Sequence, residues 1–106
     1  MAYTSTYADQ EPARIEIDAR AGHTLLEFGA PWCGHCIGAQ TAIEEALSAQ
    51  GDVVHFKIED GRGKPLGRSF RVKLWPTLVL MHDGVEVARV VRPVAAEQVE
   101  RLLASC

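Results

Sequence analysis

The sequence predicts a mixed α/β layer in which the first buried strand of a sheet leads directly into a helix. Three observations predict it: a strand, a helix and a second strand follow one another between residues 24 and 58, two β-rich runs flank Asp83-Gly84, and an amphipathic segment closes the chain. A strand–helix–strand unit favours parallel pairing through a right-handed crossover, and two runs around Asp-Gly favour an antiparallel hairpin. One mixed sheet covered by helices satisfies all three.

The segment before the first strand combines two patterns. Pro12 in front and Gly22 behind punctuate it like a helix, whereas its apolar residues alternate like those of a strand, and we predict a helix. The next segment, TLLEFGA (Thr24–Ala30), is a short apolar run that ends in Gly29 and the breaker Pro31, which predicts a buried strand. The alternating positions of the first segment are Ala13, Ile15, Ile17 and Ala19.

A helix is predicted from about Cys33 to about Gln50, because apolar residues recur near helical spacing after Cys36 while Glu44 and Glu45 lie on the other face. The run VVHFKI that follows predicts a second buried strand. Together these segments complete the crossover unit.

The second half of the chain supplies a hairpin and a closing helix. Residues 59–70 (EDGRGKPLGRSF) predict a loop that leads into a short helix or turn. Residues 77–91 (TLVLMHDGVEVARVV) predict two antiparallel strands. In residues 95–104, apolar and charged side chains lie on opposite faces, which predicts an amphipathic helix.

Composition limits the chain to one small domain. Its 106 residues are 47% hydrophobic, enough for a single core, and we expect residues 1–106 to form one domain. The formal charge of −3 lacks the basic excess typical of nucleic-acid or anionic-membrane binding. The longest nearly apolar run, residues 74–81, is far shorter than the roughly 20 residues that cross a bilayer. We therefore expect no nucleic-acid or membrane partner, and we predict a monomer.

The cysteine content and the start of the chain favour a reducing compartment. Three cysteines are too few for a disulfide scaffold, and the odd number leaves at least one thiol free. Residues 1–23 contain scattered acids where a signal peptide needs an uninterrupted apolar segment, so we predict a cytoplasmic protein. Cys106 ends the chain, where a structural disulfide is poorly placed. The chemistry therefore narrows to Cys33 and Cys36.

The spacing of Cys33 and Cys36 suits a pair of thiols that exchanges disulfides. Free N–H groups and the macrodipole at the start of a helix stabilise an anion, so we expect Cys33 to be the reactive thiolate. Cys36 lies one turn further on the same face and resolves the mixed disulfide that Cys33 forms. Between them, the imidazole of His35 would add to the stabilisation of the thiolate.

Metal, haem and phosphate sites do not fit the sequence. Zinc would need about two more ligands at compatible spacing, but the remaining histidines are scattered. Haem attachment needs a histidine where position 37 is Ile, and a phosphate loop fails because Pro65 follows Lys64 in place of Ser or Thr. We expect no cofactor beyond the Cys33–Cys36 disulfide itself.

The stretch LLEFGAPWCGHC at residues 25–36 resembles the active-site strand and motif of the thioredoxin superfamily. Its CGHC and the glutamate before it are more similar to a protein disulfide isomerase domain than to bacterial thioredoxin with CGPC. A second segment, LWPT at residues 74–77, resembles the family's loop in which a proline after a cis peptide bond faces the cysteines. The resemblance implies the thioredoxin fold, a central mixed β-sheet flanked by helices on both faces, and a thiol–disulfide oxidoreductase.

The resemblance implies roles for further residues. Pro76 is the family's cis-proline, and the backbone of the residue before it pairs with the bound peptide. Glu27 falls where the family keeps a buried acid under the resolving cysteine. Burial would favour its protonated form and fit it to exchange a proton with Cys36, whereas its alternative is an outward-facing strand glutamate. Lys57 falls where many thioredoxins carry a lysine near that acid; it could equally be a strand lysine that snorkels to water.

The surface around the thiols departs from the family pattern. Trp75 stands where a small residue usually precedes the proline, and Arg92 stands where thioredoxins have a glycine beside the peptide groove. Both would narrow the groove or change its charge, and so restrict the set of partners. The alternatives are that Trp75 only packs against the hairpin and that Arg92 is only solvated. With Gly34 in the motif, Trp32 would offer a contact surface to the incoming peptide, or it simply covers the end of the strand.

The partners expected for such a site are a protein or peptide that carries a disulfide and a dithiol or reductase that donates electrons. An alternative is a redox-switched binding module, in which a thioredoxin-like surface docks a partner and the cysteines only control the docking. Trp75 and Arg92 favour it most.

Overall fold

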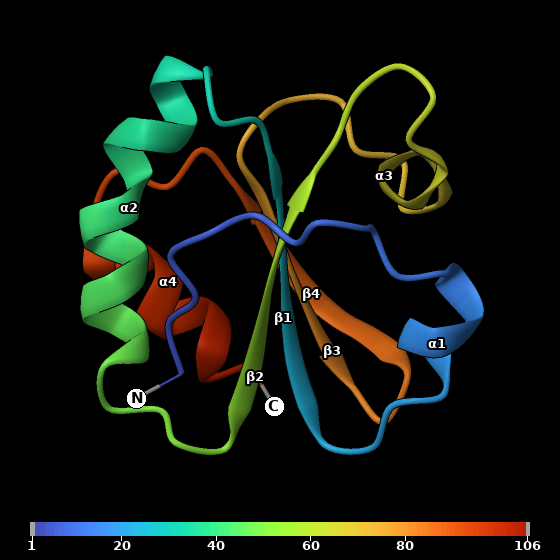
Figure 1. Cartoon of the computed structure of the whole chain (residues 1–106). Helices are drawn as coiled ribbons and strands as arrows, with labels where there is room; N and C mark the ends of the chain where they lie inside the picture. Colours follow the sequence, from blue (N-terminus) through green and yellow to red (C-terminus); the bar gives the residue numbers. More distant parts are fainter. Residues whose placement is uncertain (1, 106) are drawn as a thin grey trace.

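Four strands form one mixed sheet with helices on both faces (Figure 1). The structure, a computed structural model, describes residues 2–105. Strand order is β2-β1-β3-β4; β1 pairs with β2 in parallel and with β3 antiparallel, and β3 pairs with β4 antiparallel. In chain order the elements are α1 (Arg14–Asp18), β1 (His23–Gly29), α2 (Gly34–Leu47), β2 (Val53–Glu59), α3 (Pro65–Ser69), β3 (Thr77–His82), β4 (Val85–Val91) and α4 (Ala96–Leu103).

The strand β1 is central, and its residues 24–29 are all buried. Because side chains alternate along a strand, β1 sends Leu25 and Glu27 to the face covered by α2 and α4, and Leu26 and Phe28 to the face covered by α1 and α3. Burial on both faces explains why this strand is a continuous apolar run rather than an alternating one. Glu27 is the exception in that run.

Two hydrophobic cores fill the two sides of the sheet. On the side of α2 and α4, the buried cluster comprises Leu25, Ala39, Ile43, Ala46, Leu47, Val53, Leu78, Leu80, Val99 and Leu102. On the side of α1 and α3, it comprises Ile17, Leu26, Phe28, Ile58, Leu66, Phe70, Val79 and Met81. The predicted mixed sheet with helices on both faces is therefore confirmed.

The boundaries of the elements differ from the sequence prediction by a few residues. The N-terminal helix is confirmed but short, and the loop from residue 59 leads into the short helix α3, as predicted. The long helix was predicted from about Cys33 to about Gln50 but extends only over Gly34–Leu47, because Cys33 is its N-cap and Ser48 its C-cap. Asp83 and Gly84 both have positive φ, which gives the hairpin the primed turn that matches the twist of its strands.

The fold brings two loops together beside the N-terminus of α2. One loop leaves the end of β1 and carries Ala30 to Cys33; the other leads into β3 and contains a cis peptide bond between Trp75 and Pro76. Buried Ala30, Cys33 and Cys36 form a small cluster against which the half-buried Trp75 packs. None of the helices within residues 2–105 has the length and apolar character needed to span a bilayer.

Candidate active site

Cys33 caps the N-terminus of α2 with its own sulfur. The Sγ atom accepts a hydrogen bond from the backbone N–H of Cys36 at 3.2 Å, and the side chain is 8% exposed. Pro31 and the extended backbone of Cys33 end the strand and turn the chain into the helix at this point. A free N–H group of the first turn therefore points at the sulfur, and the positive end of the helix dipole lies beside it, as suits a nucleophile at this position.

Cys36, in contrast to Cys33, is a buried thiol with a raised pKa. It is 1% exposed, and burial together with its hydrogen bond to Cys33 raises its pKa to about 12, although a backbone hydrogen bond involving Ala30 acts in the opposite direction. Both cysteines are free thiols in this structure. At neutral pH, Cys36 therefore keeps its proton and needs a base before it can attack.

Glu27 lies in the interior beneath Cys36. Its side chain is 0% exposed, so the outward-facing alternative is wrong. Each carboxylate oxygen accepts one hydrogen bond: Oε2 from Nε2 of Gln40 at 2.7 Å, and Oε1 from Nε2 of His55 at 2.9 Å. These bonds offset part of the desolvation cost of a carboxylate that β1 holds in an apolar layer.

His55 is held in one tautomer by the N-terminal segment. The backbone N–H of Thr4 donates to Nδ1 of His55 at 2.9 Å, so Nδ1 acts as the acceptor. The ring proton is therefore on Nε2, which donates the hydrogen bond to Glu27. The hydroxyl of Thr4 also donates to the backbone carbonyl of His55 at 2.8 Å. Residues 2–8 thus close the site from outside.

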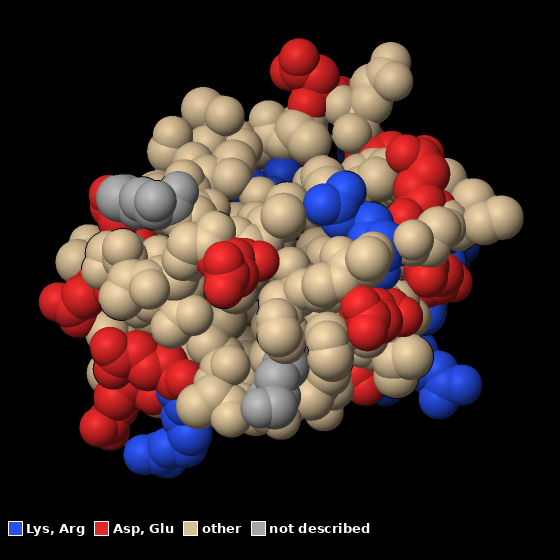
Figure 2. Space-filling view, turned by 90° about the horizontal axis from the view of Figure 1, so that it is seen from below, with Lys and Arg blue, Asp and Glu red and all other residues tan. Residues whose placement is uncertain are grey.

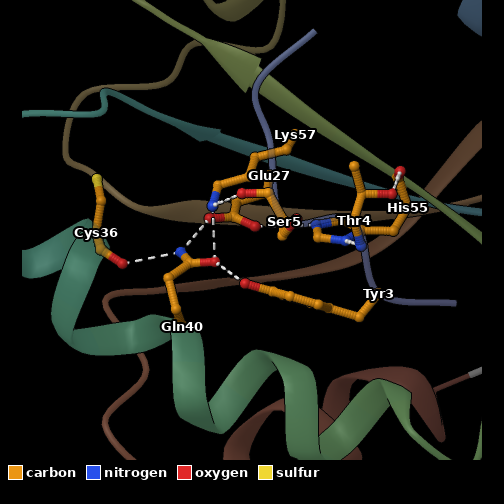
Figure 3. Close-up of polar contacts among 8 residues, drawn as sticks. All are labelled: Tyr3, Thr4, Ser5, Glu27, Cys36, Gln40, His55 and Lys57. Carbon is orange, nitrogen blue, oxygen red and sulfur yellow. Dashed lines mark hydrogen bonds and ion pairs between the residues drawn. The ribbon is translucent and has the colours of Figure 1, made fainter. Parts of the chain in front are cut away.

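Gln40 connects the acid to the resolving cysteine, as Figure 3 shows. Besides the bond to Glu27, Nε2 of Gln40 donates to the backbone carbonyl of Cys36 at 2.8 Å. Its Oε1 accepts from the hydroxyl of Tyr3 at 2.6 Å and from Nζ of Lys57 at 2.9 Å. The amide is therefore fixed on both sides, and we refer to Glu27, Gln40, His55, Lys57 and Tyr3 as the buried polar cluster.

Lys57 is buried, so the interpretation of a lysine that snorkels to water is wrong. It pairs with Glu27 in the parallel register of β1 and β2, but its Nζ donates to Gln40 and to the backbone carbonyl of Ser5 at 3.1 Å. Its link to the acid therefore runs through Gln40. The ammonium also lies 4.9 Å from the ring centre of Tyr7.

Tyr7 places a phenol beside the resolving thiol. A Cβ atom on Gly29 would lie 2.6 Å from Sγ of Cys36 and 3.2 Å from the hydroxyl of Tyr7, so these two atoms share the space that glycine leaves. Burial, the neighbouring Cys36 and a hydrogen bond with its thiol raise the pKa of Tyr7. Tyr7 and Cys36 line a cavity of about 340 Å³ together with Gln40 and Lys57. A larger residue at position 29 would remove this arrangement.

Two tryptophans form the exposed side of the site. Trp32 is 72% exposed and meets Trp75 edge to face, with ring centres 5.4 Å apart. Nε1 of Trp75 donates to Oδ2 of Asp60 at 2.9 Å. Asp60 follows β2, and its own N–H donates to the carbonyl of Gly29 at 2.8 Å. Trp75 thus packs on the thiols rather than on the hairpin.

Arg92 is half-buried, and its side chain is bound rather than only solvated. Its Nε donates to the backbone carbonyl of Trp75 at 2.8 Å, and its N–H donates to the carbonyl of Pro76 at 2.9 Å. Gly34 and His35 are exposed on the first turn of α2, where they line a second hollow of about 340 Å³ together with Arg92.

Five residues of the site were missed by sequence analysis: Tyr3, Tyr7, Gln40, His55 and Asp60. Two of them left a signal in the sequence. Gln40 lies four residues after Cys36 and hence on the same helix face. His55 shares the inward parity of Lys57 on β2, but it was weighed only as a scattered metal ligand. Tyr3, Tyr7 and Asp60 lie outside the strands and helices, and their contacts depend on tertiary packing.

No group of three or more His, Cys, Asp or Glu side chains within residues 2–105 is arranged to hold a metal ion. The thiol of Cys106, predicted to be free of any structural role, lies outside these described residues.

The arrangement can perform dithiol–disulfide exchange, because a stabilised nucleophile and a protonated resolving thiol lie one helical turn apart above an internal acid. The comparisons agree. The family model described as Thioredoxin matches residues 7–105. The chain therefore belongs to the thioredoxin family, whose members work through a redox-active cysteine pair.

Individual relatives give the same result. Thioredoxin 2 from Pseudomonas aeruginosa PAO1, in its reduced form, superposes with a TM-score of 0.86 and 52% identity over 97% of this chain and 95% of that one. Thioredoxin H2-2 of Oryza sativa subsp. japonica is 36% identical over 63% of this chain and 50% of its own length. Protein disulfide-isomerase A2 of Pongo abelii is 41% identical over 57% of this chain and 12% of its own. The chain thus spans about half the length of the rice thioredoxin and a small part of the isomerase.

Proposed function

We propose that this protein is a thiol–disulfide oxidoreductase that exchanges the Cys33–Cys36 dithiol with disulfides of proteins or peptides. One observation carries the proposal: the sulfur of Cys33 caps α2, while Cys36 is buried with a raised pKa above the carboxylate of Glu27. The two sulfurs therefore differ in their surroundings: Cys33 caps the helix, and Cys36 is buried with a raised pKa, as suits a nucleophile and a resolving thiol. Family membership and the thioredoxin and isomerase relatives support the same class.

In the reducing direction, the thiolate of Cys33 attacks one sulfur of the substrate disulfide. An S–S bond forms between Cys33 and the substrate, and the other substrate sulfur leaves as a thiolate that takes a proton from water. Glu27 then accepts the proton of Cys36, whose sulfur attacks Cys33 and releases the second substrate sulfur as a thiolate. This thiolate takes a proton from water, and Glu27 returns its proton to solvent. Two electrons pass to the substrate, and Cys33 and Cys36 remain as a disulfide; oxidation is the reverse.

The exposed apolar surface around the thiols supports a polypeptide substrate. Trp32, Ile37, Leu74 and Val94 are large apolar side chains that lie exposed on the loops and the helix start beside Cys33. Such a group of exposed apolar residues is typical of a protein contact surface. We propose that a disulfide-bearing segment packs on it, and that a dithiol or reductase partner returns electrons to the pair.

The alternative, a redox-switched binding module with little turnover, is not favoured. It rested on Trp75 and Arg92, and both have local roles: Trp75 packs on the cysteines and bonds Asp60, and Arg92 holds the carbonyl of Trp75. The internal acid and its hydrogen bonds would have no use in a surface that only docks.

The test is a cleavage assay with a disulfide-linked peptide pair and dithiothreitol as the electron donor, in a Cys106→Ser background. The parent is expected to turn over and Cys33→Ser to be inactive. Without dithiothreitol, Cys36→Ser is expected to accumulate a mixed disulfide with the peptide that mass spectrometry detects. Turnover by Cys33→Ser equal to that of the parent would refute the assignment of the nucleophile and the proposed activity with it.

The direction of electron flow is measured separately, by equilibrating the Cys33–Cys36 pair in graded glutathione buffers. A potential near −270 mV, as in thioredoxin, would support a reductant in the cytoplasm, which stays our predicted compartment. A potential near −180 mV, as in protein disulfide isomerase, would instead support a disulfide donor and contradict that compartment.

A further inference from the structure

A cavity of about 450 Å³ lies beside the tryptophan pair, between α3 and the loop that leads to β3. Its size falls within the range of about 300–1,000 Å³ that is typical of ligand pockets. Val72 and Trp75 give it apolar wall, and most of its other side chains are basic. The lining comprises Asp60, Gly61, Lys64, Arg68, Arg71, Val72, Lys73 and Trp75.

The charge of this region is opposite to that of the chain. Residues 62–73 contain five of the 11 lysines and arginines, in a protein whose formal charge is −3. The ion pairs found among residues 2–105 use none of these five. Figure 2 shows the end of the molecule away from the thiols, where acidic side chains are scattered over the surface. The five cations are Arg62, Lys64, Arg68, Arg71 and Lys73.

The acid in the cavity is already engaged. Oδ2 of Asp60 accepts the Nε1–H of Trp75, and its carboxylate packs so closely on Gly67 that no larger residue would fit there. The exposed cations Arg68, Arg71 and Lys73 have no ion-pair partner among the described residues, and all three line the same cavity. Repulsion between like charges costs stability, and a negatively charged ligand would relieve it.

Trp75 connects the cavity to the thiols. One part of its side chain packs against Cys33 and Cys36, and the residue also lines the cavity. A polypeptide whose disulfide reaches Cys33 can therefore continue across Trp75 and enter the basic region. This continuity distinguishes the cavity from an isolated surface hollow.

We propose that this cavity binds an acidic stretch of the polypeptide that carries the substrate disulfide. The inference rests on the proposed oxidoreductase function and deepens it by naming the class of substrate. A polypeptide fits better than a small anion because the cations come from before, within and after α3 and are mostly exposed, so they suit several carboxylates along a chain. Complementary charge of this kind raises association rates and selects partners.

The experiment compares two disulfide-linked peptide pairs that differ only in three glutamates, replaced by glutamines in the neutral version. The readout is the ratio of kcat/KM for the acidic peptide to that for the neutral peptide, with dithiothreitol as the donor. We expect the parent to prefer the acidic peptide, and the ratio to fall about three- to tenfold in Arg68→Glu. The preference is also expected to weaken as salt rises from 50 to about 500 mM, because salt screens exposed charges.

Arg101→Glu is the matched control. Arg68 and Arg101 are both exposed arginines in the last turn of a helix, so the two substitutions change the net charge and the helix end in the same way. The ratio is expected to stay at the parent value in Arg101→Glu. Thermal unfolding shows whether Arg68→Glu still folds. If it does not, Lys73→Glu repeats the test, because Lys73 lies outside any helix.

The outcomes separate the two proposals. Equal kcat/KM for both peptides in the parent, or an equal fall in Arg68→Glu and Arg101→Glu, would overturn the acidic-substrate proposal while the oxidoreductase function stands. Failure to cleave either peptide would count against the function itself. Oxidised glutathione serves as a third substrate: if Arg68→Glu slows it as much as the acidic peptide, the cavity binds small carboxylates and the polypeptide assignment is wrong.

Discussion

The two sides of Cys36 differ in almost every physical respect. On one side, Glu27, Gln40 and His55 are joined by hydrogen bonds of 2.7–2.9 Å in an interior closed by residues 2–8. On the other side, Trp32 is exposed and makes contacts that water or a substrate could replace. The buried side can hold and move a proton, and the exposed side can receive a polypeptide.

The difference teaches how one site can separate chemistry from recognition. A buried polar network works only when each member is satisfied, so its residues constrain one another. Exposed apolar and charged residues carry no such constraint and can change with the partner. We therefore expect substitutions on the buried side to alter pH dependence and stability, and substitutions on the exposed side to alter KM.

Glu27→Gln is the strongest test of the buried side. The amide keeps the shape but cannot accept the proton of Cys36, so we expect release of the mixed disulfide at pH 7 to slow on the order of 10²-fold. The rate should recover as the pH rises, because solvent hydroxide then takes the proton. Rapid-quench measurement of the mixed disulfide across pH 6–10 checks both expectations.

Glu45→Gln is the control for that experiment, because Glu45 is an exposed glutamate on α2. It should leave the rate and its pH profile at the parent values. A Glu27→Gln variant that folds, as shown by an intact thermal transition, and resolves the mixed disulfide at the parent rate would exclude the carboxylate as the base.

The exposed and buried sides also differ in how well the sequence predicted them. The order of elements, the mixed sheet and the place of the thiols at the start of a helix followed from local patterns in the sequence. Glu27 was recognised through resemblance, while the residues alone left its direction open, because a strand that is buried on both faces does not show which face a polar residue takes.

The N-terminal residues that complete the buried side of the site could not be derived in the same way. Tyr3, Thr4 and Tyr7 come from a segment without regular structure, and their contacts with β2 and α2 join residues more than 25 positions apart. Local periodicity carries no information about such contacts. The same holds for Trp75, whose indole reaches Asp60 only because two loops converge after the sheet has formed.

The raised pKa of Cys36 predicts how the stability of the reduced protein depends on pH. The unfolded thiol ionises near its ordinary value of 9, whereas the folded thiol keeps its proton until about pH 12. The stabilisation is therefore complete below pH 9, and it is lost between pH 9 and 12 at up to about 1.4 kcal/mol per pH unit. Urea unfolding at pH 8, 9 and 10 measures it.

The oxidised protein and Cys36→Ala are the controls, since neither has this thiol to titrate. Their stability should fall less steeply over the same range, and the remaining slope should reflect other groups, including Tyr3 and Tyr7, whose pKa values are also raised. Identical slopes for the reduced and oxidised forms would contradict the assignment of a protonated buried thiol.

Trp32→Ala tests the exposed side. Loss of a large, accessible aromatic surface beside Cys33 is expected to raise KM for a disulfide-linked peptide pair about tenfold and to leave the rate of mixed-disulfide resolution unchanged. Ile15→Ala is the control, because Ile15 is as exposed as Trp32 but lies on α1, away from the thiols. A fall in the rate of mixed-disulfide resolution, with KM unchanged, would mean that Trp32 acts in the resolution step and not in substrate binding.

Tyr7→Phe gives the smallest expected effect and tests where the boundary between the two sides lies. The hydroxyl of Tyr7 lies beside the sulfur of Cys36, so it can donate a hydrogen bond to the thiolate that forms during resolution. Its loss is expected to slow release of the mixed disulfide about threefold, in line with the net value of one hydrogen bond. The measurement is single-turnover release at pH 7.

Tyr3→Phe is the matched control, because it removes the same atom from a tyrosine that donates to Gln40 instead of to sulfur. Both variants lose one hydrogen bond and should lose similar stability, so a difference in resolution rate isolates the contact with sulfur. If the two variants slow release equally, the effect acts through packing of residues 2–8, and the N-terminal segment serves as a cover. If only Tyr7→Phe is slow, that segment supplies a group to the reaction, and the buried side of the site extends to a part of the chain outside every helix and strand.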